Sequence, residues 1–126
     1  LRDVYKRQVL DDAIIGSIEY AVEHLGTPLV VVLGHENCGA VTAAVQGNKE
    51  NSHISCLVNA LQPAVKQAKS EKGDLIDNAV HDNIKIVVES LKSSKPVLSE
   101  LSKEGKVKIV GAYYHLDTGK IDIINP

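Results

Sequence analysis

The sequence has 126 residues, of which 44% are hydrophobic and 24% charged, a balance typical of one globular domain rather than of a disordered chain. Fourteen basic and sixteen acidic residues give a formal net charge of -2 at pH 7. This near balance argues against nucleic acid or an anionic membrane as the main partner. Since Trp, Phe and Met are absent, we expect an aliphatic core.

The apolar runs and the cysteines indicate where the protein works. The longest uninterrupted apolar run, residues 29–33, is far shorter than the roughly 20 residues that span a bilayer. The two cysteines, Cys38 and Cys56, are too few for a disulfide scaffold and fit a reducing compartment. We therefore expect no membrane segment and a cytoplasmic location.

The first eight residues, LRDVYKRQ, differ from the rest of the chain. They contain both of its arginines and follow neither a helical nor a strand period. Because such a segment resembles translated vector or adaptor sequence, we expect residues 1–8 to be a non-native leader and residues 9–126 to form the domain. A frayed native terminus is the alternative.

The first regular element is predicted to be a helix that begins at Asp11. Asp11 or Asp12 is placed to cap it, and Gly26 to end it. Its apolar residues recur at helical spacing and are Ile14, Ile18, Ala21, Val22 and Leu25.

Residues 29–33 form an apolar, mostly β-branched run without polar alternation. This pattern is typical of a strand that is covered on both faces in a parallel sheet, so we expect a central strand. A loop over 34–39 follows, and then a short helix over 40–45 that ends near Gly47.

The next three patterns are helical as well. They cover residues 53–68, 76–91 and 96–103. Pro63 lacks an N–H group and is expected to bend or interrupt the first of these helices, whereas Pro96 is acceptable in the first turn of the last one.

Residues 107–114 and 121–124 have the pattern of strands joined by a turn over 117–120, in which Gly119 takes the position that favours positive φ. The fold class is therefore α/β, with a mainly parallel sheet flanked by helices and a C-terminal hairpin. Because a strand as apolar as 29–33 needs a neighbour on each edge, we expect that one or more N-terminal strands are missing.

The segment GHENCG, residues 34–39, lies between a strand and a helix, where open α/β sheets place their ligands. His35 and Cys38 offer an imidazole and a thiolate, which are donors well suited to Zn²⁺. Spacing alone is weak support, because a tetrahedral site needs four ligands.

Two other interpretations of this segment stay open. Helix N–H groups at Gly39 and beyond could bind a small anion in a metal-free α/β module, or Cys38 beside His35 could serve as the nucleophile of a thiol enzyme. A phosphate-binding loop is excluded, because Ala40 and Val41 stand where Lys and Ser or Thr are required.

Residues 11–126 resemble the catalytic domain of β-class carbonic anhydrases, from its middle to its end. The likeness is carried by DDAIIGSIEYAVEHL, LVVVLGHENCGAV and VGAYYHLDTGKI. It implies that His35 and Cys38 are two of three protein ligands of a catalytic Zn²⁺, and that the enzyme interconverts carbon dioxide and bicarbonate. Carbonic anhydrases are the standard example of enzymes in which zinc lowers the pKa of a bound water toward 7.

The resemblance further implies that the backbone N–H of Gly39 faces the substrate and that Tyr20 lines the pocket, within the chain or across a dimer. A half-buried helix tyrosine without such a role is the alternative for Tyr20. Members of the family form homodimers and larger homo-oligomers. The family's C-x-D-x-R segment, which carries the third ligand and an Asp–Arg pair, has no match here, so we assign no catalytic residue and expect weak or absent zinc retention.

The remaining cysteine and histidines receive no role in the site. Cys56 is interpreted as a core thiol and His24 as a helix-end residue. The histidines interpreted as surface or capping residues are His53, His81 and His115.

Overall fold

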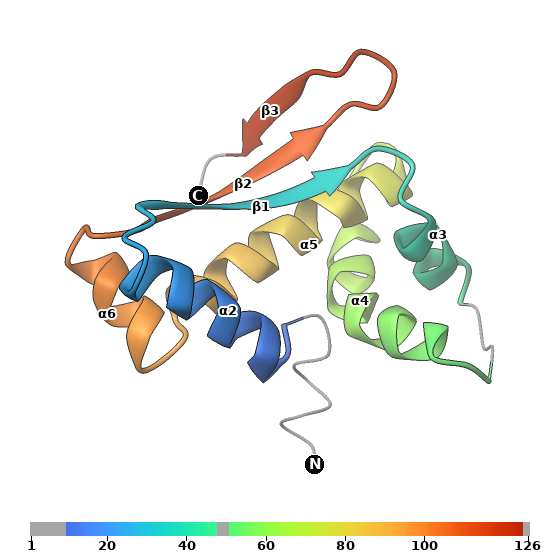
Figure 1. Cartoon of the computed structure of the whole chain (residues 1–126). Coiled ribbons are helices and arrows are strands. Elements are labelled where there is room, and N and C mark those ends of the chain that lie inside the picture. Colours follow the sequence, from blue (N-terminus) through green and yellow to red (C-terminus); the bar gives the residue numbers. More distant parts are fainter. Residues whose placement is uncertain (1–9, 48–50, 125–126) are drawn as a thin grey trace.

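The computed structural model describes residues 10–47 and 51–124 (Figure 1). The predicted leader, residues 1–8, lies outside this part. The helices are α2 (Asp12–Glu23), α3 (Gly39–Gln46), α4 (Ile54–Ala68), α5 (Leu75–Lys92) and α6 (Val97–Lys103), and the strands are β1 (Leu29–His35), β2 (Lys108–Tyr114) and β3 (Ile121–Ile124). None of the described helices is long and apolar enough to cross a membrane.

The three described strands form one mixed sheet in the order β1-β2-β3. β1 and β2 are parallel, with register from Leu29 opposite Lys108 to His35 opposite Tyr114. β2 and β3 are antiparallel and are joined through a turn in which Gly119 has φ +74°. The α/β fold class and the C-terminal hairpin are thus confirmed.

The prediction that residues 29–33 form a central strand covered on both faces is wrong for the described part of the chain. β1 is an edge strand, and exposure alternates along it. Leu29, Val31 and Leu33 are 48%, 45% and 56% exposed. Since successive side chains of a strand point to opposite faces, one face of β1 packs inward and the other lies in solvent.

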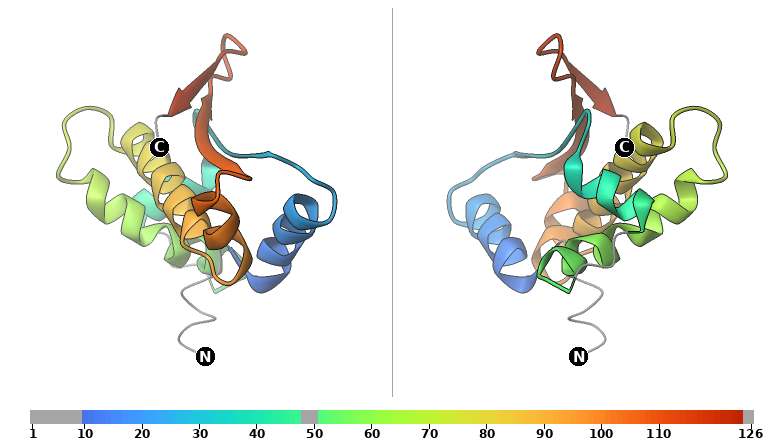
Figure 2. Two further views of the ribbon diagram at one scale, coloured as in Figure 1. Left: turned by 90° about the vertical axis from the view of Figure 1, so that its left-hand side faces the viewer. Right: turned by 90° about the vertical axis from the view of Figure 1, so that its right-hand side faces the viewer.

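Helix α5 covers the inner face of the sheet and contacts both β1 and β2. Two glycines permit this close packing, because a Cβ atom at Gly34 would lie 2.5 Å from Ile84 Cδ1, and one at Gly111 would lie 2.5 Å from Ile84 Cγ2. Ile84 itself is 2% exposed. The helices lie on one side of the sheet in Figure 1, and Figure 2 shows the hairpin projecting beyond them.

Local signals set the helix ends as expected. The Asp11 carboxylate caps α2 by accepting a hydrogen bond from the N–H of Ile14 at 2.8 Å, and Gly47 ends α3 in the left-handed conformation. The predicted interruption at Pro63 is wrong, since α4 continues through it. Packing accounts for this continuity, because the helix is buried on both sides of the proline, at Val58, Leu61, Ala64, Val65 and Ala68.

Candidate metal centre

The loop between β1 and α3 holds the two predicted metal ligands. His35 is the last residue of β1, and Cys38 is the N-cap residue of α3. Between them Asn37 has φ 55°, a left-handed conformation that turns the chain sharply. Both the backbone N–H and the hydroxyl of Thr42 donate hydrogen bonds to the carbonyl oxygen of Cys38, at 3.0 and 2.8 Å, which fixes the start of the helix.

The hydrogen bonding of His35 determines which of its nitrogens is available to a metal. Its Nδ1 lies 2.9 Å from the carbonyl oxygen of Glu36. Because a carbonyl oxygen only accepts, Nδ1 carries the hydrogen and Nε2 keeps its lone pair. Metal-binding histidines are regularly oriented in this way by a backbone carbonyl, and the exposed position of His35 leaves the ring accessible.

Cys38 offers a free thiol at the N-terminus of α3. It is half-buried, and its side chain makes no capping hydrogen bond. The positive end of a helix dipole favours negative charge at this position, as on a metal-bound thiolate. The sulfur is therefore placed where an anionic ligand is stabilised.

As a donor set, His35 and Cys38 fit a zinc ion, because imidazole and thiolate are its usual protein ligands. They would supply two of the four ligands that a tetrahedral zinc ion takes. Within residues 10–47 and 51–124, neither belongs to a group of three His, Cys, Asp or Glu residues with convergent ligand atoms. The chain thus offers a partial zinc ligand set.

The two predicted substrate-binding residues lie at different places. Gly39 is the first residue of α3, and a Cβ atom there would meet nothing within 4 Å, so its surroundings are open. Tyr20 is exposed in the last turn of α2, beside His24. Figure 1 shows α2 and α3 near opposite ends of β1, so the fold of one chain does not bring Tyr20 to His35. A role across a dimer stays a prediction.

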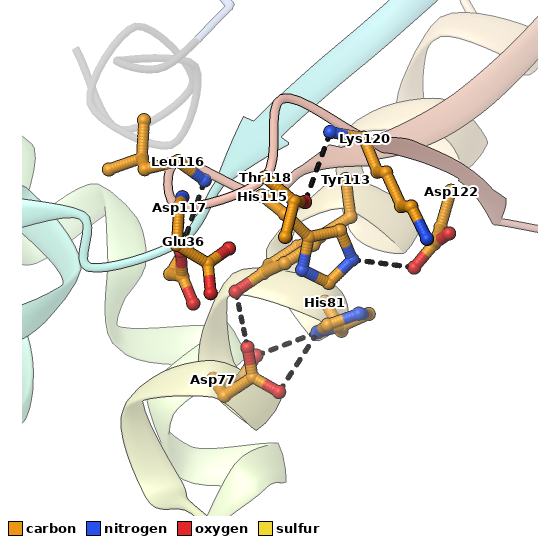
Figure 3. A network of polar contacts seen from close by, with 10 residues as sticks. All are labelled: Glu36, Asp77, His81, Tyr113, His115, Leu116, Asp117, Thr118, Lys120 and Asp122. Atoms are coloured by element: carbon orange, nitrogen blue, oxygen red, sulfur yellow. Dashed lines mark hydrogen bonds and ion pairs between the residues drawn. The ribbon is translucent and has the colours of Figure 1, made fainter.

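Figure 3 shows a polar network beside the loop that the sequence reasoning missed. His115 is half-buried, and its Nε2 lies 2.6 Å from Oδ2 of Asp122. The Glu36 carboxylate accepts hydrogen bonds from the backbone N–H groups of Leu116 and Asp117, at 3.0 and 3.4 Å. His115 thus lies near the surface, as interpreted from the sequence, but its contact with Asp122 was not predicted. The hairpin register, which pairs Tyr113 with Asp122, is the signal that could have placed His115 near Asp122.

A second part of the network lies against α5. The Tyr113 hydroxyl donates a hydrogen bond to the Asp77 carboxylate, and the ring of His81 stacks on that of Tyr113 with centroids 4.3 Å apart. Burial, followed by the bond to Asp77, raises the pKa of Tyr113. His81 is thus half-buried and packs against Tyr113, a contact that its interpretation as a surface or capping residue did not include.

The other three assignments have mixed outcomes. His24 is the C-cap residue of α2, as expected for a helix-end residue, and His53 is exposed at the start of α4. Cys56 is only half-buried and lies outside the buried core, so its interpretation as a core thiol is wrong. Cys38, by contrast, packs against that core.

A known protein family matches most of this chain. The carbonic anhydrase family model matches residues 3–121. This chain belongs to the β-carbonic anhydrase family. The match begins within residues 1–8, whose assignment as a leader stays a prediction.

Two curated relatives of this β-carbonic anhydrase come from mycobacteria. The chain is 35% identical over 116 residues to carbonic anhydrase 2 of Mycobacterium tuberculosis, covering 89% of this chain and 56% of the relative. It is 31% identical over 119 residues to carbonic anhydrase of Mycolicibacterium smegmatis, covering 91% and 58%. The chain therefore spans little more than half the length of these relatives.

Solved structures confirm the fold. A tetrameric β-carbonic anhydrase of Sordaria macrospora superposes with a TM-score of 0.81 at 19% identity, over 93% of this chain and 62% of that one. The β-carbonic anhydrase CafA of Aspergillus fumigatus gives a TM-score of 0.77 at 26% identity, over 92% and 57%. The arrangement of helices around the sheet is that of β-carbonic anhydrases.

Proposed function

We propose that the protein to which this chain belongs is a zinc-dependent enzyme that interconverts carbon dioxide and bicarbonate. The observation that carries the proposal is the β1–α3 loop of this family member, in which His35 turns Nε2 away from its backbone partner and Cys38 caps the next helix as a free thiol.

In this proposal, His35 Nε2 and Cys38 Sγ hold the zinc ion. A bound zinc ion would act as a Lewis acid and make a hydroxide nucleophile available near neutral pH. The chain's own residues position the ligands: the Glu36 carbonyl fixes the imidazole ring, and Thr42 fixes the turn at Cys38. The N–H of Gly39, which has no acceptor within its helix, would donate to a substrate oxygen.

Zinc affinity is the direct test of this proposal, because the chain contains only part of the proposed zinc ligand set. Loss of one thiolate from a four-coordinate site removes binding energy and charge compensation. We expect the 126-residue chain to lose zinc on dialysis, and a chain extended at its amino end by a strand with Cys-x-Asp-x-Arg to retain it and to hydrate carbon dioxide in a stopped-flow indicator assay.

Cobalt substitution tests the assigned ligands, because a Co²⁺–thiolate bond gives a near-ultraviolet charge-transfer band. In the extended chain we expect this band to be lost in Cys38→Ser and kept in Cys56→Ser, the matched control. Failure of the extended chain to bind any zinc would contradict the proposal.

Two other results would support the alternative functions. A melting temperature raised by bicarbonate or phosphate without zinc would support a metal-free anion-binding module. Rapid alkylation of Cys38 with no effect of chelators would support a thiol enzyme.

Self-association and a cytoplasmic location are further parts of the proposal. Self-association as a homodimer or larger homo-oligomer is supported by the outer face of the sheet, where apolar side chains are 45% to 67% exposed on Leu29, Val31, Leu33, Ile121 and Ile123. The cytoplasmic location is supported by the two free cysteines. Sedimentation velocity tests the first, since a strictly monomeric protein at all concentrations would contradict it.

A further inference from the structure

A second set of potential metal ligands lies next to the β1–α3 loop. Glu36 comes from this loop, whereas His115 and Asp117 come from the connection between β2 and β3 (Figure 3). One ligand atom from each of the three lies within 4.8 Å of the others. The parallel register brings them together, because the N–H of Glu36 donates to the carbonyl oxygen of Tyr114 at 3.0 Å and so extends the pairing of β1 with β2 by one residue.

His115 is oriented as a metal-binding histidine is. Its Nε2 donates to the Asp122 carboxylate at 2.6 Å, because a carboxylate accepts hydrogen bonds. This leaves Nδ1 as the ligand atom, and in Figure 3 the other ring nitrogen points to the side of Glu36 and Asp117. Ligating histidines regularly donate their second N–H to a carboxylate, which fixes the ring and raises its basicity.

Glu36 is held in place as well. Its Oε1 accepts hydrogen bonds from the N–H groups of Leu116 and Asp117, at 3.0 and 3.4 Å. These bonds fix the direction of the carboxylate, and its second oxygen, Oε2, adds a further lone-pair site for a cation. Asp117 is exposed, so the group is open to solvent on that side and water can complete the coordination.

The charge around the group also favours a cation. Glu36, Asp117 and Asp122 place three carboxylates around the single imidazole of His115. The three ligands offer one imidazole nitrogen and two carboxylate oxygens, which is a harder donor set than His35 and Cys38. Carboxylates suit Mn²⁺, and imidazole suits Zn²⁺. A divalent ion would offset the repulsion among these carboxylates.

We propose that Glu36, His115 and Asp117 form a second metal site, for a divalent first-row cation such as Mn²⁺, which ties the loop after His35 to the β2–β3 connection. The site is separate from the zinc ligands His35 and Cys38, and it neither rests on the proposed carbon dioxide chemistry nor requires a third zinc ligand. Binding would hold the segment whose carbonyl orients His35, and thus stabilise the geometry of the neighbouring loop.

Mn²⁺ is the probe, because bound Mn²⁺ loses the sharp electron paramagnetic resonance signal of the free ion. The bond to Asp122 raises the pKa of His115, so titrations are run at mildly alkaline pH, which favours the neutral ring. We expect the full chain to bind one Mn²⁺ and its melting temperature to rise with metal concentration, as mass action requires. An undiminished free Mn²⁺ signal at millimolar metal would overturn the proposal.

Variants locate the bound ion. His115→Gln and Asp117→Asn each remove a ligand and should weaken Mn²⁺ binding more than Asp122→Asn, which removes only the partner of His115 and should cost about 10- to 100-fold. The controls are His24→Gln and Glu23→Gln, which change a histidine and a carboxylate in an exposed pair 3.4 Å apart and should have no effect. Binding that survives His115→Gln and Asp117→Asn would place the ion elsewhere and refute the site.

The double variant His35→Gln/Cys38→Ser separates this site from the zinc site. Mn²⁺ binding should persist in it, whereas loss of binding would assign the ion to the zinc ligands and refute the proposal. Since Glu36→Gln can disturb the loop, the exposed Asp117→Asn is the decisive variant, and its metal-free melting temperature and circular dichroism show that the fold is intact. Failure of this second site leaves the proposed carbon dioxide chemistry untouched.

Discussion

The two faces of the sheet bury their apolar side chains to very different extents. Against α5, Gly34 and Gly111 let Ile84 approach so closely that an added Cβ atom would overlap it, and Ile84 is 2% exposed. On the outer face, Leu33 and Ile123 leave 56% and 67% of their surface in solvent. The comparison shows that apolar side chains stabilise the fold on the face packed against α5, whereas on the outer face they are available for association.

The largest effect is expected from truncation of the inner face. Ile84→Ala removes a fully buried side chain that contacts both strands, and the cavity it leaves should lower the free energy of unfolding by about 2–5 kcal/mol. Urea denaturation followed by circular dichroism measures this. A loss equal to that of an exposed substitution would show that the inner face is not the packed one.

A smaller loss is expected from filling the contact between strand and helix. Gly111→Ala places a methyl group 2.5 Å from Ile84 Cγ2, and this overpacking should cost about 1–3 kcal/mol. The same substitution should cost less in the Ile84→Ala background, where the methyl group has room. A double-mutant cycle measures the coupling, and strictly additive effects would contradict the proposed contact.

The third prediction concerns Asp82, a buried carboxyl on α5 whose Oδ2 has no hydrogen-bond partner among the described residues. Burial, and then the neighbouring carboxyl of Glu71, raises the pKa of Asp82 above its ordinary value of 3.8, while Lys85 and His81 oppose the shift. Because the pKa of Asp82 is higher in the folded state than in the unfolded state, its contribution to the free energy of unfolding is fully present below the unfolded-state pKa. This contribution is lost as pH rises through the folded-state pKa.

Asp82→Asn removes the charge, and its amide can donate to Glu71. We expect the variant to be more stable than the unmodified chain at neutral pH, by about 1 kcal/mol, and to lose the decline in stability with rising pH. Denaturation at a series of pH values above about 4 measures both, because the ordinary pKa lies just below this range. Glu89→Gln, at an exposed carboxyl of the same helix, is the control, and a parallel decline in Asp82→Asn would contradict the assignment.

The smallest effect on folding is expected on the outer face. Leu33→Thr keeps a strand-forming residue and changes a side chain that is already half exposed, so the free energy of unfolding should change by less than about 0.5 kcal/mol. Its effect should appear in sedimentation velocity as weaker self-association. A large loss of stability with unchanged association would remove the distinction between the two faces.

Most local features could be predicted from the sequence, and the exceptions share a cause. The helix that begins after Asp11, the turn at Gly119 and the loop with His35 and Cys38 lie where the sequence predicts them, because caps, turn residues and periodicity act within a few residues. The roles of His81 and His115 could not be predicted in this way, because each depends on contact with a residue on another element or strand.

The sequence alone predicted the helices, the strands and a loop that carries the donors His35 and Cys38, since these follow from hydrophobic period, from residue type and from likeness to a family. Only the tertiary structure decided that β1 lies at the edge of the described sheet and that Glu36 meets His115 and Asp117. The physical reason is strand pairing: the register that places His35 opposite Tyr114 joins segments that are far apart in the chain, and no local pattern encodes that choice.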